Sequence, residues 1–472
     1  MLWLILCAIT VTLIAYLYRQ RVRHMSILER NGIHGPKPSL IWGNMFEFLE
    51  GRSVDRDANW IKQYGKIMGY YFGFRPTVLI ADPDLAKNIQ IKDFQHFVDR
   101  PHGTTKNGIN ADSREKSMLT RLIGKRWKEV RSVLTPTFSA SKLKTMSPIM
   151  EDTINNMMNI IDKKSKTEEE FDIYDMFQNL TTDVIGRTAF GVQSNVQNEE
   201  NNKFLNAAKA LFNMKFNRWI FLMSSMSYER MTASNDRDIQ VNAQKGVKNG
   251  TNGVKHSKSD ISLTDIEIIA NSVLFYEAGY ETTSTALGFM GHILVNYPEV
   301  QEKIREEVRE LYESDGKLDI NTVNKLDFME CVLNETMRLY PPVITFVSRE
   351  CLQDYKYKDI TIPKGSAVRF ATHYLHHDPD YWPSPEKFDP FRFSPERKHE
   401  IHPSSWQPFG SGPRNCIGMR FALFEAKLAL AKILMKYRLE PGPNTEIGEL
   451  STECKAVTYT PKNGVYVKAV KI

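Results

Sequence analysis

The hydrophobic pattern of the chain begins with one apolar run that differs from everything after it. Residues 2–18 are almost all apolar and carry no charge, and Arg19, Arg21 and Arg23 follow them. A helix over this run is about 25 Å long at about 1.5 Å per residue, which approaches the thickness of a thin bilayer. Because the basic residues come after the run, we expect the rest of the chain to face the cytosol. A cleaved signal peptide is the alternative, but no basic segment precedes the run and no small-residue cleavage site follows it.

The remaining chain is predicted to be one large unit. We assign residues 1–18 to a transmembrane anchor, 19–38 to a basic stop-transfer segment with a Gly/Pro-rich hinge, and 39–472 to a single domain. No repeat, low-complexity tract or Pro/Gly/Ser-rich linker divides this last range.

Within that domain, apolar positions follow mostly a helical period, with a few short β-branched or aromatic runs. Helical patterns dominate from about residue 125 to 188, and Asp82 followed by Pro83 is typical of a helix start. Strands are predicted at 67–72, 77–81, 360–362 and 367–371, the first two as a hairpin. The expected fold class is mainly α with a small β-sheet subdomain.

One predicted helix is long enough to cross the whole domain. Ser262 and Asp265 have the spacing of a capping box, and nothing interrupts the pattern before Pro298. The helix would be about 50 Å long. Its middle carries glutamates and threonines among apolar residues, and polar groups inside a central helix need partners or a chemical role.

Composition and charge narrow the function classes. The 472 residues have a formal net charge of +6, which is too weakly basic to indicate nucleic acid and compatible with an anionic membrane surface. The five cysteines are odd in number and form no C-x-x-C pair, so a disulfide framework or a Cys-rich zinc site is not expected. A reducing compartment is indicated, in which any special cysteine serves chemistry.

The segment with the clearest chemistry surrounds Cys416. The chain reads F-x-x-G-x-R-x-C-x-G from Phe409 to Gly418, with Gly412 and Arg414 at the other fixed positions. Its chance occurrence in such a chain is on the order of 1 in 10⁴. With this loop the sequence resembles the cytochrome P-450 superfamily, closest to its animal microsomal drug- and xenobiotic-oxidising clan, and the resemblance covers nearly the whole chain.

The resemblance implies a haem-thiolate monooxygenase. Cys416 would ligate the iron of haem b, because a thiolate donates electron density that favours O–O cleavage. Gly412 and Gly418 would let the backbone turn and approach the macrocycle, and Arg414 would pair with a propionate. Phe409 belongs to the same haem-binding loop, and three further positions match the family's propionate-binding residues: Trp127, Arg131 and Arg349.

The middle of the long helix matches the family's oxygen-activation motif. Ala278 and Gly279 would lie against the haem, with Gly279 leaving space for O₂. Thr282 would bond a backbone carbonyl and hold a water, and Glu281 would relay protons from solvent. Glu277, one residue before the motif, faces either the pocket or a polar seam between helices.

Three further groups of residues are carried over. Glu335, Arg338 and Arg392 match a buried ion triad with a structural role. Substrate-contacting positions are expected in the loop after Phe97 and at Phe275, Ala278, Val343, Ile344 and Thr345. Basic side chains that could form a docking face are Lys125, Arg126, Lys128 and Lys427.

The resemblance also implies partners and a location. Electrons would come from NADPH through NADPH–cytochrome reductase, with cytochrome b5 as a further candidate donor, and one oxygen atom of O₂ would enter a lipophilic small molecule. The protein would be held in the endoplasmic reticulum membrane by its single N-terminal span, in contact with lipid, with the catalytic domain in the cytosol.

The chain departs from the family in one region. The roof of the pocket, around residues 204–259, is short by about one helix and one loop. A non-catalytic haem- or ligand-binding protein with a truncated roof is therefore an alternative. A reductase-independent isomerase or dehydratase of the same fold is another, which the Glu281–Thr282 pair disfavours.

Overall fold

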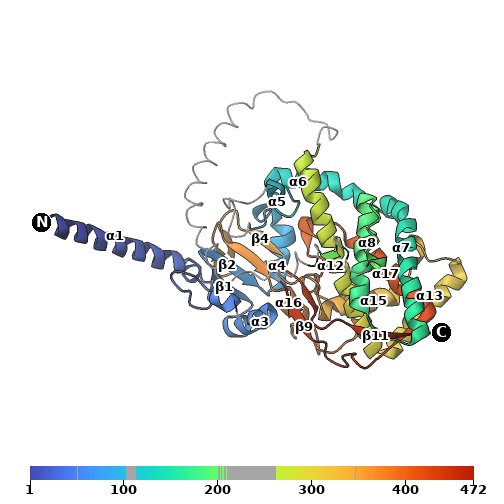
Figure 1. The fold of residues 1–472 in the computed structure, drawn as a ribbon. Coiled ribbons are helices and arrows are strands. Elements are labelled where there is room, and N and C mark those ends of the chain that lie inside the picture. Colours follow the sequence, from blue (N-terminus) through green and yellow to red (C-terminus); the bar gives the residue numbers. More distant parts are fainter. Residues whose placement is uncertain are drawn as a thin grey trace.

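The computed structural model describes residues 1–49, 51–101, 113–199, 202, 205–206, 209, 262–345, 347–455 and 457–472. Within these ranges a sheet-rich part lies beside the N-terminal helix and a helical part lies farther from it (Figure 1). The shortened roof predicted around residues 204–259 falls almost entirely outside the described residues.

The helices carry most of the described chain. They are α1 (Leu2–Met25), α2 (Ile27–Arg30), α3 (Ser53–Tyr64), α4 (Pro83–Lys87), α5 (Ser113–Lys116), α6 (Gly124–Leu134), α7 (Ala140–Thr167), α8 (Ile173–Phe190), α12 (Asp265–Asn296), α13 (Pro298–Asp315), α14 (Ile320–Val323), α15 (Asp327–Leu339), α16 (Thr372–His377) and α17 (Met419–Lys436). Two short 3₁₀ turns matter for the site, η7 (Pro390–Phe393) and η9 (Gly412–Arg414). The prediction of a mainly helical chain is confirmed.

Four small sheets accompany the helices. The strands are β1 (Ile67–Phe72), β2 (Arg75–Ile80), β3 (Phe171–Asp172), β4 (Ser348–Glu350), β5 (Tyr355–Tyr357), β6 (Ile360–Ile362), β7 (Ala367–Phe370), β8 (Tyr437–Glu440), β9 (Thr452–Cys454), β10 (Tyr459–Pro461) and β11 (Tyr466–Lys471). The largest sheet has the order β1-β2-β7-β4, with β2 and β7 parallel and the other neighbours antiparallel. All four predicted strands are present.

Two helix starts show how local sequence sets the elements. Asp82 caps α4 by accepting from the backbone N–H of Leu85, as predicted. For α12 the predicted cap was wrong by two residues, because the capping box is formed by Thr264 and Glu267. Glu267 also receives two hydrogen bonds from Arg126 of α6, and this contact fixes the register of the cap.

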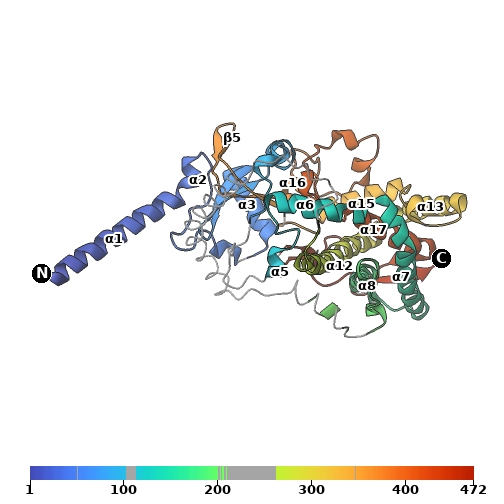
Figure 2. The same ribbon diagram turned by 90° about the horizontal axis from the view of Figure 1, so that it is seen from above.

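α12 is the central helix of the molecule. It spans 32 residues and lies between α8 and α17, which Figure 2 shows from above. The main hydrophobic core forms where α7, α8, α12, α13, α15 and α17 meet, and a second core fills the space around the β1-β2-β7-β4 sheet.

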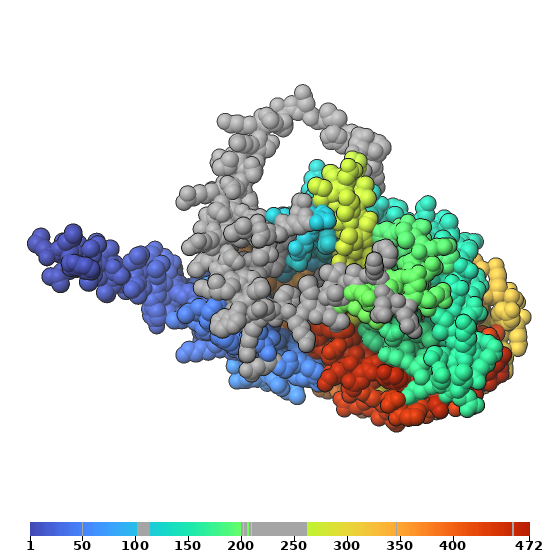
Figure 3. Space-filling model, viewed as in Figure 1, coloured from blue at the N-terminus to red at the C-terminus, as the bar shows by residue number. Residues whose placement is uncertain are grey.

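The two ends of the chain lie far apart. α1 extends away from the globular part as an apolar helix of 24 residues, and its most hydrophobic window is not buried. β11 pairs with β3 and contacts α7 and α8. The red C-terminal part of the chain therefore lies against the green and teal helical part in Figure 3.

Candidate functional site

A cavity of about 260 Å³ lies between α12 and the segment that leads into α17. It gathers most of the predicted site residues from elements far apart in sequence. Those on its wall are Trp127, Arg131, Phe275, Ala278, Gly279, Thr282, Val343, Phe409, Arg414, Cys416 and Gly418.

Cys416 reaches this cavity from the loop ahead of α17. Its backbone N–H donates to the carbonyl of Phe409 at 2.8 Å, which folds the loop back on itself. Burial raises the pKa of the thiol, while the backbone N–H of Gly418 and the charges of Arg131 and Arg100 lower it. The start of α17, at Met419, adds the positive end of a helix dipole beside the sulfur. These donors favour a thiolate once a metal replaces the proton.

The two predicted glycines of the loop differ in what they require. Gly412 has φ +70°, and a Cβ there would lie 1.8 Å from the carbonyl oxygen of Gln90, so only glycine fits. Gly418 has φ −90°, and its nearest neighbour would be Phe138 at an ordinary 3.7 Å. No protein atom therefore requires glycine at Gly418. The space that it leaves belongs to the cavity.

Arginines form a basic wall on the cavity. Arg131 donates to the backbone and side-chain oxygens of Asn415 at 3.0 and 2.9 Å, and Arg414 donates to the carbonyl of Leu122 at 2.8 Å. Arg100 also lines the cavity, and sequence reasoning missed it because it belongs to none of the recognised motifs. Its position directly before Pro101, at the start of the loop expected to contact substrate, was the available signal.

Arg349 lies behind this wall and does not line the cavity itself. It is fully buried on β4, and its guanidinium donates to the carbonyls of Ser348 and Ser411. Within the part of the chain that the structure describes, neither its Nε nor the Nε of Arg414 has a hydrogen-bond partner. The guanidinium of Arg414 lies over the ring of Trp127 at 4.2 Å, which places that indole at the same end of the cavity.

Among the described residues, these arginines lie close enough together to repel one another. Burial, followed by repulsion from neighbouring arginines, lowers the pKa of Arg414 to about 9 and that of Arg100 to about 10. The pKa of Arg349 is lowered for the same two reasons. Asp99 offsets part of the charge on Arg414 from 3.6 Å. Such a cluster fits a ligand that brings negative charge.

The cavity as a whole therefore fits haem b. Cys416 supplies a sulfur ligand, the arginine wall and Trp127 meet two carboxylates at one edge, and the rest of the wall is largely apolar. The apolar part of the wall includes Leu119, Leu274, Phe275, Val343 and Phe421.

The oxygen-activation motif lies where α12 borders the cavity. The Thr282 hydroxyl donates to the carbonyl of Ala278 at 2.6 Å, as the sequence predicts. A Cβ on Gly279 would lie 3.1 Å from Ile185 of α8. The missing side chain of Gly279 thus serves close packing of two helices, while Gly279 and Ala278 both border the cavity.

The two acidic residues near this motif stand outside the cavity wall. Glu281 is buried and turned toward α8, where the Tyr174 hydroxyl and the Gln178 amide donate to it at 3.3 and 3.4 Å. Glu277 is half-buried, and burial raises the pKa of its carboxyl. The structure does not bring either carboxylate directly onto the cavity.

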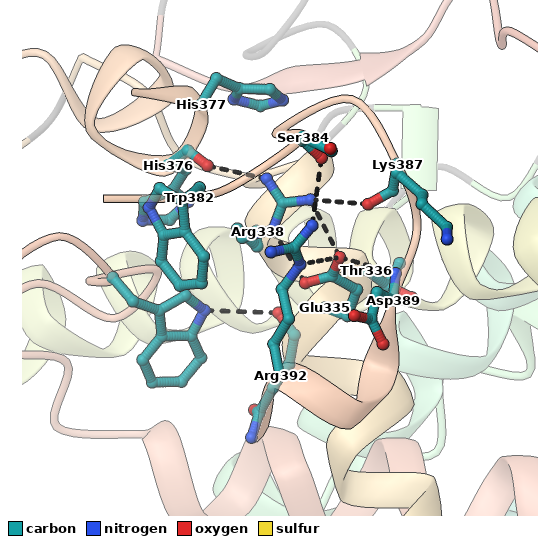
Figure 4. A network of polar contacts seen from close by, with 12 residues as sticks. Glu335, Thr336, Arg338, His376, His377, Trp382, Ser384, Lys387, Asp389 and Arg392 are labelled. Atoms are coloured by element: carbon teal, nitrogen blue, oxygen red, sulfur yellow. Dashed lines mark hydrogen bonds and ion pairs between the residues drawn. The ribbon is translucent and has the colours of Figure 1, made fainter. Parts of the chain in front are cut away.

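The three residues of the predicted ion triad lie together in one network of polar contacts (Figure 4). Arg338 donates to both oxygens of Glu335 at 2.8 and 2.9 Å, and the Nε of Arg392 lies 3.4 Å from Glu335. The backbone N–H of Asp389 donates to the same carboxylate at 2.9 Å. All three charged side chains are buried.

A histidine links this triad to the Cys416 loop. Arg338 donates to the carbonyl of His376 at 2.8 Å, and the His376 Nε2 accepts from the backbone N–H of Gln407 at 2.9 Å. Burial lowers the pKa of His376 to about 3, so the ring is neutral and can accept. Gln407 stands two residues before Phe409, so the triad supports the loop through this contact.

Two of the predicted substrate positions lie elsewhere. Val343 lines the cavity, whereas Ile344 packs in a separate cluster with Val54 and Phe289. Thr345 lines a different, very small pocket beside His373. The remaining expectation, for the loop after Phe97, falls partly outside the described residues.

The structure contradicts one of the four residues predicted for the docking face. Lys125 and Lys128 are exposed, and Arg126 is partly so. Lys427 is wrong as a docking residue, because only 2% of its side chain is exposed and its ammonium pairs with Glu330 at 2.5 Å. Its position on α17 faces the core.

A further cavity, of about 340 Å³, is lined by His292, Glu446 and Tyr466 among others. It contains none of the predicted site residues. The chemistry therefore belongs to the cavity at Cys416, whose thiol, arginine wall and α12 threonine define a haem-thiolate protein.

Comparison with known proteins gives the family. The family model described as Cytochrome P450 matches residues 33–255 and 229–467. Cytochrome P450 3A11 of Mus musculus is 32% identical over 477 residues, covering 94% of this chain and 92% of that protein. Cytochrome P450 3A2 of Rattus norvegicus is 33% identical over 479 residues, and cytochrome P450 3A31 of Mesocricetus auratus is 34% identical over 477, each with the same two coverages. The chain belongs to the cytochrome P450 family and is a haem b-dependent monooxygenase, as its sequence predicts.

Proposed function

We propose that this monooxygenase is held in the endoplasmic reticulum membrane by α1 and oxidises lipophilic small molecules with electrons from NADPH, delivered by NADPH–cytochrome reductase. The observation that carries the proposal is the Cys416 thiol on one cavity with Thr282 and an otherwise largely apolar wall. Similarity to several cytochromes P450 3A over most of the chain supports it.

Each group of site residues has a separate proposed role. Cys416 would hold the iron, and Arg100, Arg131, Arg349, Arg414 and Trp127 would hold the carboxylate edge. Haem, when bound, supplies the activation of O₂. Thr282 would hold a proton-donating water in the cavity, and Glu281 would supply that water with protons from solvent. The apolar wall would exclude bulk water and admit lipophilic substrates.

The exposed lysines Lys125 and Lys128 lie on α6, which also carries Trp127 and Arg131. We propose this end of α6 as part of the reductase docking face, since the surface charge there is basic and next to the haem wall. The apolar α1, followed by basic residues, would anchor the chain with its catalytic domain in the cytosol.

The test of the proposal is made on the full-length protein in lipid. Ligation by Cys416 predicts a thiolate-type carbon monoxide difference spectrum, which Cys416→Ser should abolish. With reductase and a panel of lipophilic substrates, NADPH use should yield oxidised product. A thiolate spectrum without product from any substrate would instead favour the ligand-binding alternative.

The variant Thr282→Ala distinguishes a role in proton delivery from a role in haem binding. We expect it to retain haem while the fraction of NADPH recovered in product falls at least about tenfold, with hydrogen peroxide taking its place. Ser284→Ala is the matched control, because Ser284 makes the same bond to a carbonyl four residues earlier but is buried away from the cavity. Equal coupling in both variants would contradict the role of Thr282.

A further inference from the structure

Glu281 is a buried carboxylate with contacts from two directions. Only 1% of the residue is exposed. Tyr174 and Gln178 of α8 donate to its two oxygens at 3.3 and 3.4 Å. From the other direction, the Lys455 ammonium lies 3.6 Å from its Oε1. A carboxylate this deep in the protein is costly unless a cation accompanies it.

Lys455 comes from a distant part of the chain. It follows β9 in the β9–β10 hairpin, and its backbone N–H donates to the carbonyl of Thr458 at 2.9 Å. The hairpin is tied to the cavity wall by a bridge between Thr458 and Val343. These backbone contacts bring Lys455 next to α12, where its ammonium meets Glu281.

Lys455 also connects the buried site to the surface. Its side chain is 17% exposed, and its ammonium lies 3.7 Å from Glu453, whose carboxylate is 42% exposed. Glu281 itself has no comparable exposure. Among the described side chains, the chain of charged groups from solvent to Glu281 therefore runs through this hairpin.

The other titratable groups near Glu281 do not compensate its charge. Burial and the charge of Glu281 both raise the pKa values of Tyr174 and Tyr280, so these phenols stay neutral donors. Asp175 of α8 adds negative charge near Tyr280 and is paired with Lys209. Within the described part of the chain, Lys455 is the cation in ion-pair distance of Glu281.

We propose that Lys455 is a positioning residue whose ammonium pairs with the Glu281 carboxylate on the solvent side of α12 and so keeps it able to pass protons toward Thr282. The inference rests on the proposed function and names the partner of its proton-relay residue. In each transfer, a water at the hairpin that has taken up a proton from bulk solvent passes that proton to the Glu281 carboxylate and is left as neutral water. That proton then leaves toward the Thr282 side, which regenerates the carboxylate beside Lys455.

The test compares three lysine variants of the holoenzyme. Lys455→Met removes the ammonium but keeps the length of the side chain, and it should move the acid limb of the coupling–pH profile upward by about one pH unit or more. Near that limb the ionised fraction of Glu281, and coupled product formation, should fall up to about tenfold. Lys455→Arg should retain the profile. Lys462→Met, an exposed lysine after β10, should also leave it unchanged.

A second readout does not depend on turnover. Infrared difference spectra of Lys455→Met minus the parent protein should show one additional protonated carboxyl band near neutral pH, because the bands of other buried carboxyls cancel. The additional band should disappear in the double variant Lys455→Met/Glu281→Gln. A band in the first variant alone would assign the protonated carboxyl to Glu281.

The outcomes separate this inference from the proposed function. If Glu281→Gln impairs coupling while Lys455→Met changes neither the pH profile nor the infrared band, the role of Lys455 is overturned and that of Glu281 stands. If Glu281→Gln leaves coupling unchanged, the proton role of Glu281 fails, and the inference fails with it. A loss of coupling in Lys455→Met without a shift of the profile would indicate a structural effect and would also overturn it.

Discussion

At the scale of single residues, Glu335 depends on its partners to be ionised. Burial raises the pKa of this carboxyl, and the hydrogen bonds and charge of Arg338, the Asp389 N–H and the charge of Arg392 offset that rise only in part. The attraction among three buried charges compensates a desolvation cost that each would suffer alone. The stability of the fold therefore depends on all three side chains of the triad being present together.

Arg338→Met tests this dependence. We expect the free energy of unfolding to fall by about 3–5 kcal/mol, because Glu335 would keep only Arg392 as a charged partner. Urea unfolding followed by tryptophan fluorescence measures the loss, and haem content reports on the supported loop. Arg438→Met is the matched control, since the Arg438–Glu440 pair is 48% and 37% exposed and should contribute less than about 1 kcal/mol.

If Arg338→Met does not accumulate as folded protein, Arg338→Lys keeps the charge but loses the two-pronged contact. It should give an intermediate loss of stability. A loss in either variant no larger than that of Arg438→Met would contradict the assigned role of the triad.

Individual residues also mark the limit of sequence reasoning. Cys416 and Glu335 could be found because fixed spacings surround them. Arg100 has no such context, and its role emerges only when it joins Arg131 and Arg414 on one cavity wall, with Arg349 behind them. Lys427 was taken for surface because its partner Glu330 lies on another helix, 97 residues earlier, where sequence gives no sign of the pairing.

At the scale of elements, the close approach of α8 and α12 places Glu281 beside Tyr174 and Gln178. Small residues allow this approach. A Cβ on Gly288 would lie 2.7 Å from the ring of Tyr174, and one on Gly279 would lie 3.1 Å from Ile185. Periodicity predicted the helices but could not predict which glycine meets which side chain, because that depends on the crossing of two helices.

For Gly288→Ala we expect the opposite of what the intrinsic helix preference of alanine alone predicts. Alanine favours a helix interior by about 1 kcal/mol over glycine, yet we expect a net loss of about 1–3 kcal/mol because the Tyr174 ring must move. Thermal unfolding of the holoenzyme measures the sign. In a Tyr174→Ala background the same change should be neutral or stabilising, and a stabilising effect in the parent protein would contradict the packing argument.

The start of α12 shows a second limit at this scale. Two capping patterns overlap in the sequence, at Ser262 and at Thr264, and local chemistry permits both. The structure selects Thr264, because its Glu267 also binds Arg126 of α6. The existence of the helix could be predicted, but the choice of its first residue required a tertiary contact.

At the scale of the whole molecule, the anchor and the globular part meet at the last turn of α1. Arg21 contacts the carbonyl of Leu40 and lies over the ring of Phe74, and His24 bonds the Phe74 carbonyl at 2.6 Å. Met25 and Leu28 belong to the core around the largest sheet. The sequence boundary at residue 18 marks the end of the apolar run, whereas the domain itself begins within α1.

Two truncations of different length should separate anchoring from folding. Removing residues 2–20 deletes the exposed part of α1, so the protein should leave salt-washed membranes while its carbon monoxide spectrum stays the same. Removing residues 2–28 also deletes Met25 and Leu28, which are 7% and 2% exposed, and should lower the free energy of unfolding by a further amount of about 2–5 kcal/mol. Leu28 lies directly over β1, where its Cδ1 leaves no room for a side chain at Gly69, so its loss opens the sheet core to solvent.

Membrane flotation and urea unfolding of both truncated proteins measure the two effects independently. Equal stability of the two proteins would show that the end of α1 is dispensable for the fold, and retention of the shorter truncation on washed membranes would show that α1 is not the sole anchor.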